Sequence, residues 1–132
     1  MIRKEYTIVS GYKKPVPLLE VHLIGSKGRQ KCLCLLDSGA TYSVFHSSIA
    51  IDAGYRISDM QQEEIAFGGG RVLTYRTIVL LDVYGKRIRS EICFTDKMIL
   101  RFNLLGRHAF FNKFDEVCFL ERQASPCIEL RF

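Results

Sequence analysis

The stretch Leu-Leu-Asp-Ser-Gly-Ala at residues 35–40 decides the fold of this chain. The apolar run from Lys31 to Leu36 predicts a strand that ends directly before Asp37. Such a strand places the carboxylate on a tight turn, where Gly39 lets other backbone approach closely. Ser38 adds a hydroxyl that can bond to neighbouring backbone or to a facing copy of itself. Because Asp-Ser-Gly also occurs in ordinary turns, the rest of the chain decides whether Asp37 carries chemistry.

Two further glycine segments follow Asp37 in order. Gly68-Gly69-Gly70 separates two strand-like segments, which predicts a hairpin whose tip runs from Phe67 to Arg71. Later, Leu104-Leu105-Gly106-Arg107 repeats the pattern of residues 35–39, an apolar pair that leads into a tight glycine turn. The ordered set is more specific than any one of its parts.

The remaining pattern is that of one small β-rich domain spanning residues 1–132. Short strand-like segments separated by turns favour a barrel or sandwich, and no alternation of strands with helices indicates a parallel sheet. Two short helices are expected, at 47–53 with Ser47 or Ser48 as cap and Gly54 as terminator, and at 107–113. The expected strands are 5–9, 18–24, 31–36, 43–45, 63–67, 71–81, 87–94, 116–120 and 127–132.

Taken together, these segments resemble the retropepsin-like aspartic proteases, the family of the retroviral protease, over nearly the whole chain. The resemblance implies an all-β, retropepsin-like acid-protease β-barrel with one or two short helices and one lobe per chain. The helix at 47–53 is similar to that of cellular, single-domain members. The resemblance also implies roles, with Asp37 catalytic. Ser38, Gly39 and Ala40 would form the active-site loop, Phe67, Gly68, Gly69, Gly70 and Arg71 the substrate-binding flap, and Leu105, Gly106 and Arg107 its structural support.

The second carboxylate of an aspartic protease must come from another copy of the chain. Of the six aspartates only Asp37 is followed by Ser-Gly, so a homodimer is expected. Two carboxyl groups about 3 Å apart cannot both ionise and therefore share a proton. They activate water without a metal or a cofactor. Ser38 in place of the commoner threonine, and a tip with three glycines, are the departures from the family pattern.

Composition and residue spacing argue against a membrane protein, a disulfide-rich protein and a metal-binding protein. Hydrophobic residues make up 48% and charged residues 25%, which is ordinary for a globular protein. No apolar run approaches the length of a membrane span, and no signal peptide is recognisable, so a cytoplasmic protein without membrane contact is expected. Five cysteines with scattered spacing are a poor disulfide framework. Cys32 and Cys34 share one strand face and are expected in the core, and His22, His46 and His108 have no metal-binding spacing.

Three functions remain in order of preference. The first is an aspartic endopeptidase that acts on polypeptides as a homodimer. The second is a dimeric protein-interaction module on a protease scaffold with weak or no catalysis, because fold alone does not fix function. The third rests on the net charge of +5 and is a basic β-barrel that binds nucleic acid. A solvated basic surface explains that charge more simply, and no RNA-binding signature is present, so no nucleic-acid partner is expected.

Overall fold

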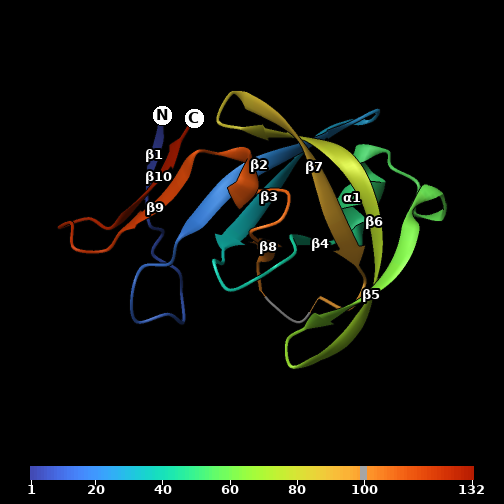
Figure 1. The fold of residues 1–132 in the computed structure, drawn as a ribbon, viewed down its shortest axis with the longest axis horizontal. Coiled ribbons are helices and arrows are strands. Elements are labelled where there is room, and N and C mark those ends of the chain that lie inside the picture. The colour runs from blue at the N-terminus through green and yellow to red at the C-terminus, as the bar shows by residue number, and fades with distance from the viewer. Residues whose placement is uncertain (99–100) are drawn as a thin grey trace.

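The computed structural model describes residues 1–98 and 101–132 (Figure 1). Over these residues, strands and short helical segments follow one another, and none of the helical segments is long. In the described part of the chain the elements are β1 (Ile2–Glu5), β2 (Leu18–Gly25), β3 (Gly28–Leu36), β4 (Val44–His46), α1 (Ser47–Ala53), the 3₁₀ turn η1 (Ile57–Asp59), β5 (Gln61–Phe67), β6 (Gly70–Val83), β7 (Lys86–Thr95), β8 (Asn103–Leu105), the 3₁₀ turn η2 (Phe111–Lys113), β9 (Glu116–Leu120) and β10 (Cys127–Arg131).

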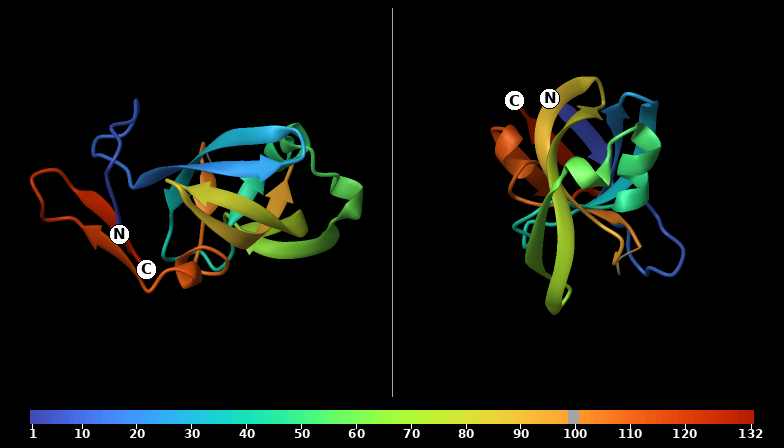
Figure 2. Two further views of the ribbon diagram at one scale, coloured as in Figure 1. Left: turned by 90° about the horizontal axis from the view of Figure 1, so that it is seen from above. Right: turned by 90° about the vertical axis from the view of Figure 1, so that its right-hand side faces the viewer.

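Seven of these strands form a sheet that closes on itself. Their order is β2-β3-β8-β4-β7-β6-β5, and an additional pairing of β2 with β6 closes the barrel. The other three strands form a separate small sheet in the order β1-β10-β9, which lies beside the barrel (Figures 1 and 2). The expected all-β barrel with one or two short helices is therefore confirmed, and the described residues contain one α-helix. No helix among the described residues is both long and apolar enough to cross a membrane.

Alternation of apolar side chains along the strands builds the core. On β2, Leu19, Val21 and Leu23 are almost fully buried, as the period-2 pattern predicts. Cys32 and Cys34 on β3 face the same core, which confirms their expected placement. The aromatic rings of Phe45 and Phe94 meet edge to face inside this core, with centroids 6.2 Å apart.

Helix α1 occurs where the sequence predicts it, but its cap differs. Gly54 ends it with a φ of 102°, the left-handed conformation that glycine adopts without strain. The expected serine cap is wrong, because the Nδ1 atom of His46 accepts the hydrogen bond from the Ser48 N–H at 3.1 Å. Ser47 already lies inside the helix, and its hydroxyl bonds to Asp96 instead.

The expected helix at 107–113 is also wrong. Residues 107–110 form turns, and only η2 is helical. Ala109 has a φ of 71°, which a right-handed helix does not contain. The His108 carbonyl, which would accept from the Asn112 N–H in a helix, accepts from the Ser43 hydroxyl at 3.2 Å instead. The N–H groups of Phe111 and Asn112 bond to the carbonyls of Gly106 and Arg107, five residues earlier, so the four-residue helical pattern is absent here.

The two ends of the chain pair with each other. β1 lies antiparallel to β10, with Ile2 opposite Leu130, so the expected strand at 5–9 begins and ends earlier than predicted. Glu129 on β10 is only 4% exposed and bonds to Arg3 at 2.8 Å and Arg131 at 2.7 Å. The hydrogen bond from Arg131 is the main cause that lowers the pKa of Glu129, with further help from the charge of Arg3. An ionised Glu129 therefore ties both terminal strands together.

Candidate active site

Asp37 lies where two parallel strands end side by side. β3 and β8 pair in register, with Leu36 opposite Leu105, so the two apolar pairs of the sequence are neighbours in space. The Asp37 N–H donates to the Leu105 carbonyl at 3.0 Å and continues this ladder by one residue. The carboxylate is consequently fixed at the mouth of the barrel, half-exposed rather than in the core.

The turn after Asp37 holds one carboxylate oxygen. The Gly39 N–H donates to Oδ1 of Asp37 at 2.8 Å, and the Ala40 N–H donates to the Asp37 carbonyl at 3.1 Å. A Cβ at Gly39 would lie 3.2 Å from that same Oδ1, so a side chain there would crowd the carboxylate. Within the described residues Oδ2 accepts no hydrogen bond, and Ser38 is exposed. One oxygen is anchored and the other is available to a partner.

The segment 106–108 supports this loop from beneath. Arg107 N–H donates to the Ala40 carbonyl at 2.9 Å and His108 N–H to the Thr41 carbonyl at 2.8 Å. The Ser43 hydroxyl accepts from the Gly106 N–H at 3.0 Å and donates to the His108 carbonyl at 3.2 Å. Four hydrogen bonds therefore fasten the loop to this segment, which makes its position a property of the fold.

Gly106 and Arg107 differ in what they contribute there. Gly106 is buried, and a Cβ on it would lie 2.8 Å from the Ala40 carbonyl oxygen and closer still to that of Tyr42. Only glycine fits this gap. The exposed Arg107 side chain donates to the Thr41 hydroxyl at 3.3 Å. It has no carboxylate partner among the residues that the structure describes.

A cavity of about 440 Å³ opens beside Asp37, between the loop and the β5–β6 hairpin. Its floor is apolar, because Val44, Ile65 and Leu104 form a buried cluster with Cys93. Phe67 and Gly68 are the residues of the expected flap that line it. Gly69, Gly70 and Arg71 lie beyond its edge, and Arg71 pairs along the hairpin with Glu64 at 2.7 Å. The other lining residues are Gly39, Ala40, Thr41, Tyr42 and Ala66.

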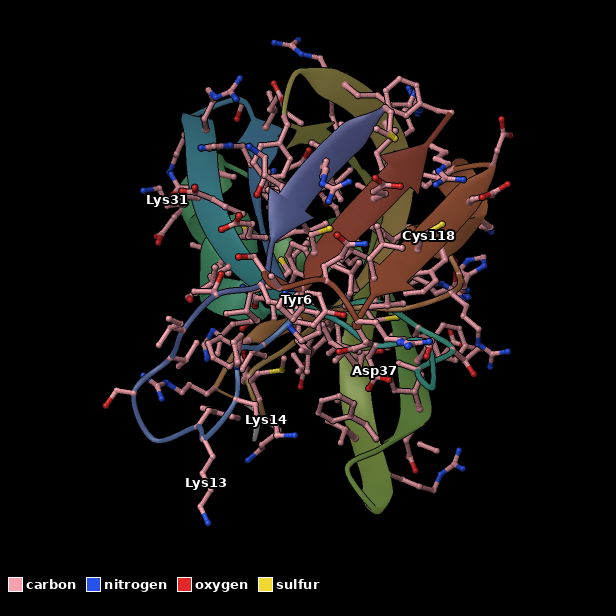
Figure 3. The ribbon with its side chains drawn as sticks, turned by 90° about the vertical axis from the view of Figure 1, so that its left-hand side faces the viewer. Tyr6, Lys13, Lys14, Lys31, Asp37 and Cys118 are labelled. Carbon is pink, nitrogen blue, oxygen red and sulfur yellow. The ribbon has the colours of Figure 1, made fainter. Side chains whose placement is uncertain are left out.

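The hairpin tip is a two-residue turn. Gly68 and Gly69 have φ values of 61° and 84°, and positive φ at both corners is the requirement of a type I′ turn. β5 ends at Phe67 and β6 begins at Gly70, so the third glycine is already strand. In Figure 3 the hairpin extends below Asp37, and the sheet of terminal strands lies above it.

The sequence analysis gave no site role to several residues that line the cavity, among them Tyr42, Val44, Ile65 and Leu104. Ile65 and Phe67 alternate along β5 and share one face, and that pattern was available as a signal. Tyr42 and Val44 come from the segment after the Asp37 loop, and Leu104 from the apolar pair before Gly106. Their meeting depends on the pairing of Val44 with Leu104, which no local pattern predicts.

The core thiols near the cavity and on β3 are poorly suited to act as nucleophiles. Burial is the main cause that raises the pKa of Cys93, beside the cavity floor, to about 11, so this thiol stays protonated at neutral pH. Burial raises the pKa of Cys32 to about 11 as well, and raises that of Cys34. In the described part of the chain no three His, Cys, Asp or Glu side chains are grouped as metal ligands. Asp37 is therefore the best-placed reactive group.

Comparison with known proteins supports the fold. No protein-family model matches the chain, and neither does any curated protein. Solved structures do match, among them EIAV protease complexed with the inhibitor HBY-793. That structure is 24% identical, the match covers 76% of this chain and 88% of that chain, and the TM-score is 0.54. The likeness shows that the chain has the retropepsin fold.

Proposed function

We propose that the chain is an aspartic endopeptidase whose active site is completed by Asp37 of a second copy. The setting of Asp37 is the observation that carries this proposal. Its Oδ1 is held by the Gly39 N–H at 2.8 Å, while Oδ2 is free of hydrogen bonds from described residues and an apolar cavity opens beside it. Retropepsin-type chemistry needs a carboxylate that is rigidly placed but not neutralised by its own chain.

The proposed reaction uses the two carboxyl groups in opposite protonation states. The ionised one takes a proton from a bound water, and the water oxygen forms a bond to the peptide carbonyl carbon. The protonated one donates to the carbonyl oxygen. As the carbon–nitrogen bond breaks, the carboxyl group that took a proton from water donates it to the leaving amine. The other carboxylate takes a proton back from a hydroxyl of the intermediate as the carbonyl reforms, so the pair returns to its starting state without a covalent enzyme intermediate. Because the pair shares one proton, it titrates as a unit.

The geometry of one face supports a twofold dimer. Asp37 and the terminal sheet face the same side of the molecule (Figure 3). β1 and β9 are the edges of that sheet, and exposed edges are usually paired or covered. A twofold axis near Asp37 would bring the residue against its own copy. The exposed Arg107 would then be available for an ion pair with the second copy.

The cavity indicates the substrate. An extended polypeptide would lie between the Asp37 loop and the β5–β6 hairpin, with residues 67–71 as its flap, and would pair by backbone hydrogen bonds as an added strand. The cavity volume of about 440 Å³ accommodates a large apolar side chain such as leucine or phenylalanine. Ser38 and Ala40 complete the loop on the substrate side, and Leu105, Gly106 and Arg107 hold it from below.

One observation favours the alternative of a protein-interaction module. β1 already pairs with β10 of its own chain, so the two chain ends form a sheet without a strand from a second copy. A monomer with one carboxylate would bind peptides in its cavity but would not cut them. The two candidates therefore differ in a single measurable outcome, the hydrolysis of bound polypeptide.

The test is the incubation of an unfolded protein with the wild type and with Asp37→Asn across pH 3 to 8. The amide keeps the shape and the acceptor for the Gly39 N–H, but it cannot act as an ionised base. Cleavage by the wild type with a bell-shaped pH profile, and none by the variant, is the expected result. Equal cleavage by the two proteins, or its abolition by EDTA, would show that Asp37 is not the catalytic group.

A further inference from the structure

A row of four polar side chains continues the cavity floor away from Asp37. Glu63 on β5 pairs with Arg76 on β6, and the Nε atom of Arg76 lies 3.7 Å from Oε1 of Glu91 on β7. His108, in the segment beneath the Asp37 loop, places Nε2 3.1 Å from the same Oε1. Glu63 precedes the cavity residue Ile65 by two positions on β5, so both lie on one face of the sheet. The row joins the root of the hairpin to the support of the Asp37 loop.

His108 contributes through two separate sets of atoms. Its backbone N–H and carbonyl hold Thr41 and Ser43 in the loop. Its ring bonds to Glu91 and also meets the ring of Tyr42 edge to face, with centroids 6.1 Å apart and planes at 75°. Because an ionised carboxylate only accepts hydrogen bonds, Nε2 is the donor toward Glu91. Tyr42 lines the cavity, so the ring links one wall of the cavity to the strand that continues its floor.

We propose that His108 is a positioning residue for substrate binding, which sets the distance between the Tyr42 wall and the hairpin wall of the cavity. This inference rests on the proposed peptidase function. Alanine at this position keeps the backbone bonds that hold the Asp37 loop, and removes only the hydrogen bond to Glu91 and the ring contact with Tyr42. The affinity for substrate should therefore change while the chemical step at Asp37 does not.

The exposure of the pair separates this role from a purely structural one. The His108 side chain is 46% exposed and that of Glu91 is 33% exposed, and exposed polar pairs contribute little to global stability. Loss of the pair should leave the unfolding transition nearly unchanged. A defect in substrate binding without a defect in folding is therefore the distinguishing sign.

The first experiment compares His108→Ala and His108→Gln with the wild type in peptide cleavage. For His108→Ala, KM should rise about fivefold, the loss expected for one partly screened hydrogen bond to a charged group, with kcat within about twofold. The glutamine amide can donate to Glu91, so His108→Gln should restore most of the wild-type KM. His22→Ala, which removes a histidine from β2 outside the cavity, is the matched control and should behave as wild type. A lowered kcat with an unchanged KM would overturn the proposal.

A second experiment does not depend on catalysis. Hydrogen exchange of the β5 and β6 amides should be faster in His108→Ala than in the wild type, and close to wild type in His108→Gln. Glu91→Ala removes the acceptor of His108 and also the contact with Arg76. The effects of Glu91→Ala and His108→Ala should therefore be less than additive in the double variant, because both remove the His108–Glu91 contact. If the wild type cuts no peptide, the proposed function fails. The exchange measurement then still shows whether the His108 side chain connects the Tyr42 wall to the β5–β6 hairpin. Unchanged exchange in His108→Ala would refute it.

Discussion

Replacing Gly106 by alanine tests how tightly the fold holds the Asp37 loop. The residue is buried and its φ is not in the left-handed region, so the methyl group acts through space alone. That Cβ would lie 2.8 Å from both the carbonyl oxygen of Ala40 and the carbonyl carbon of Tyr42. These are backbone atoms of the loop, which cannot rotate away as a side chain would. The loop itself has to move.

The size of the effect follows from these distances. Carbon atoms pack at about 3.5 to 4.0 Å, so relief of a 2.8 Å contact requires a displacement of roughly 0.7 to 1.2 Å. Overpacking of this kind costs about 1 to 3 kcal/mol in the free energy of unfolding. A misplacement of about 1 Å at a reacting group can reduce turnover roughly 100-fold. Gly106→Ala should therefore fold less stably and lose most of its peptidase activity.

The assay combines denaturant unfolding with peptide cleavage by the folded variant. Gly70→Ala is the control for stability, because a Cβ at that position meets nothing within 4 Å, and its free energy of unfolding should stay within about 0.5 kcal/mol of wild type. A Gly106→Ala protein with wild-type stability and wild-type turnover would refute the reasoning, since the loop would then be free to shift at no cost.

Three further outcomes follow from the geometry. Gly69→Val should reduce turnover more than Gly69→Asn, measured as kcat/KM, because a β-branched residue at a φ of 84° is strained whereas asparagine tolerates this region. Glu129→Gln should flatten the fall in unfolding free energy between about pH 5 and pH 3. The lowered pKa of Glu129 in the folded protein stabilises the fold above the unfolded pKa of about 4.3, and this stabilisation is lost as pH falls through the folded pKa. Iodoacetamide should label Cys118 alone in the native protein, by mass spectrometry, because the other four thiols are buried; labelling of Cys93 would contradict its burial.

The features that local sequence determines were predictable. The apolar strand before Asp37, the helix at 47–53 and the glycine hairpin each depend on neighbours within about ten residues. The tight turn at Asp37 was predictable for the same reason, because Asp37, Ser38 and Gly39 are adjacent in the chain. The structure adds that Leu36 and Leu105 lie side by side. The two similar segments of the sequence, an apolar pair before a glycine turn, are therefore the neighbouring ends of β3 and β8.

The remaining features depend on contacts between distant segments. The segment 107–113 was predicted as a helix, but the His108 carbonyl, a helical acceptor, is taken by the Ser43 hydroxyl across the fold, and this tertiary contact overrides propensity. The pairing of β1 with β10 joins the two ends of the chain, and register of this kind has no local signal. The cavity lining was not predictable for the same reason, since Tyr42 and Ile65 are brought together only by the closed barrel.

Whether two copies of Asp37 form one catalytic site is tested most directly by mixing experiments. A fixed amount of wild type is titrated with Asp37→Asn, peptide cleavage is measured, and sedimentation confirms that the two chains exchange. The account predicts that specific activity rises with wild-type concentration, and that excess variant suppresses cleavage toward zero, because mixed dimers hold only one ionisable carboxyl group. Cleavage that stays proportional to wild-type monomer, undiminished by a tenfold excess of Asp37→Asn, would contradict it.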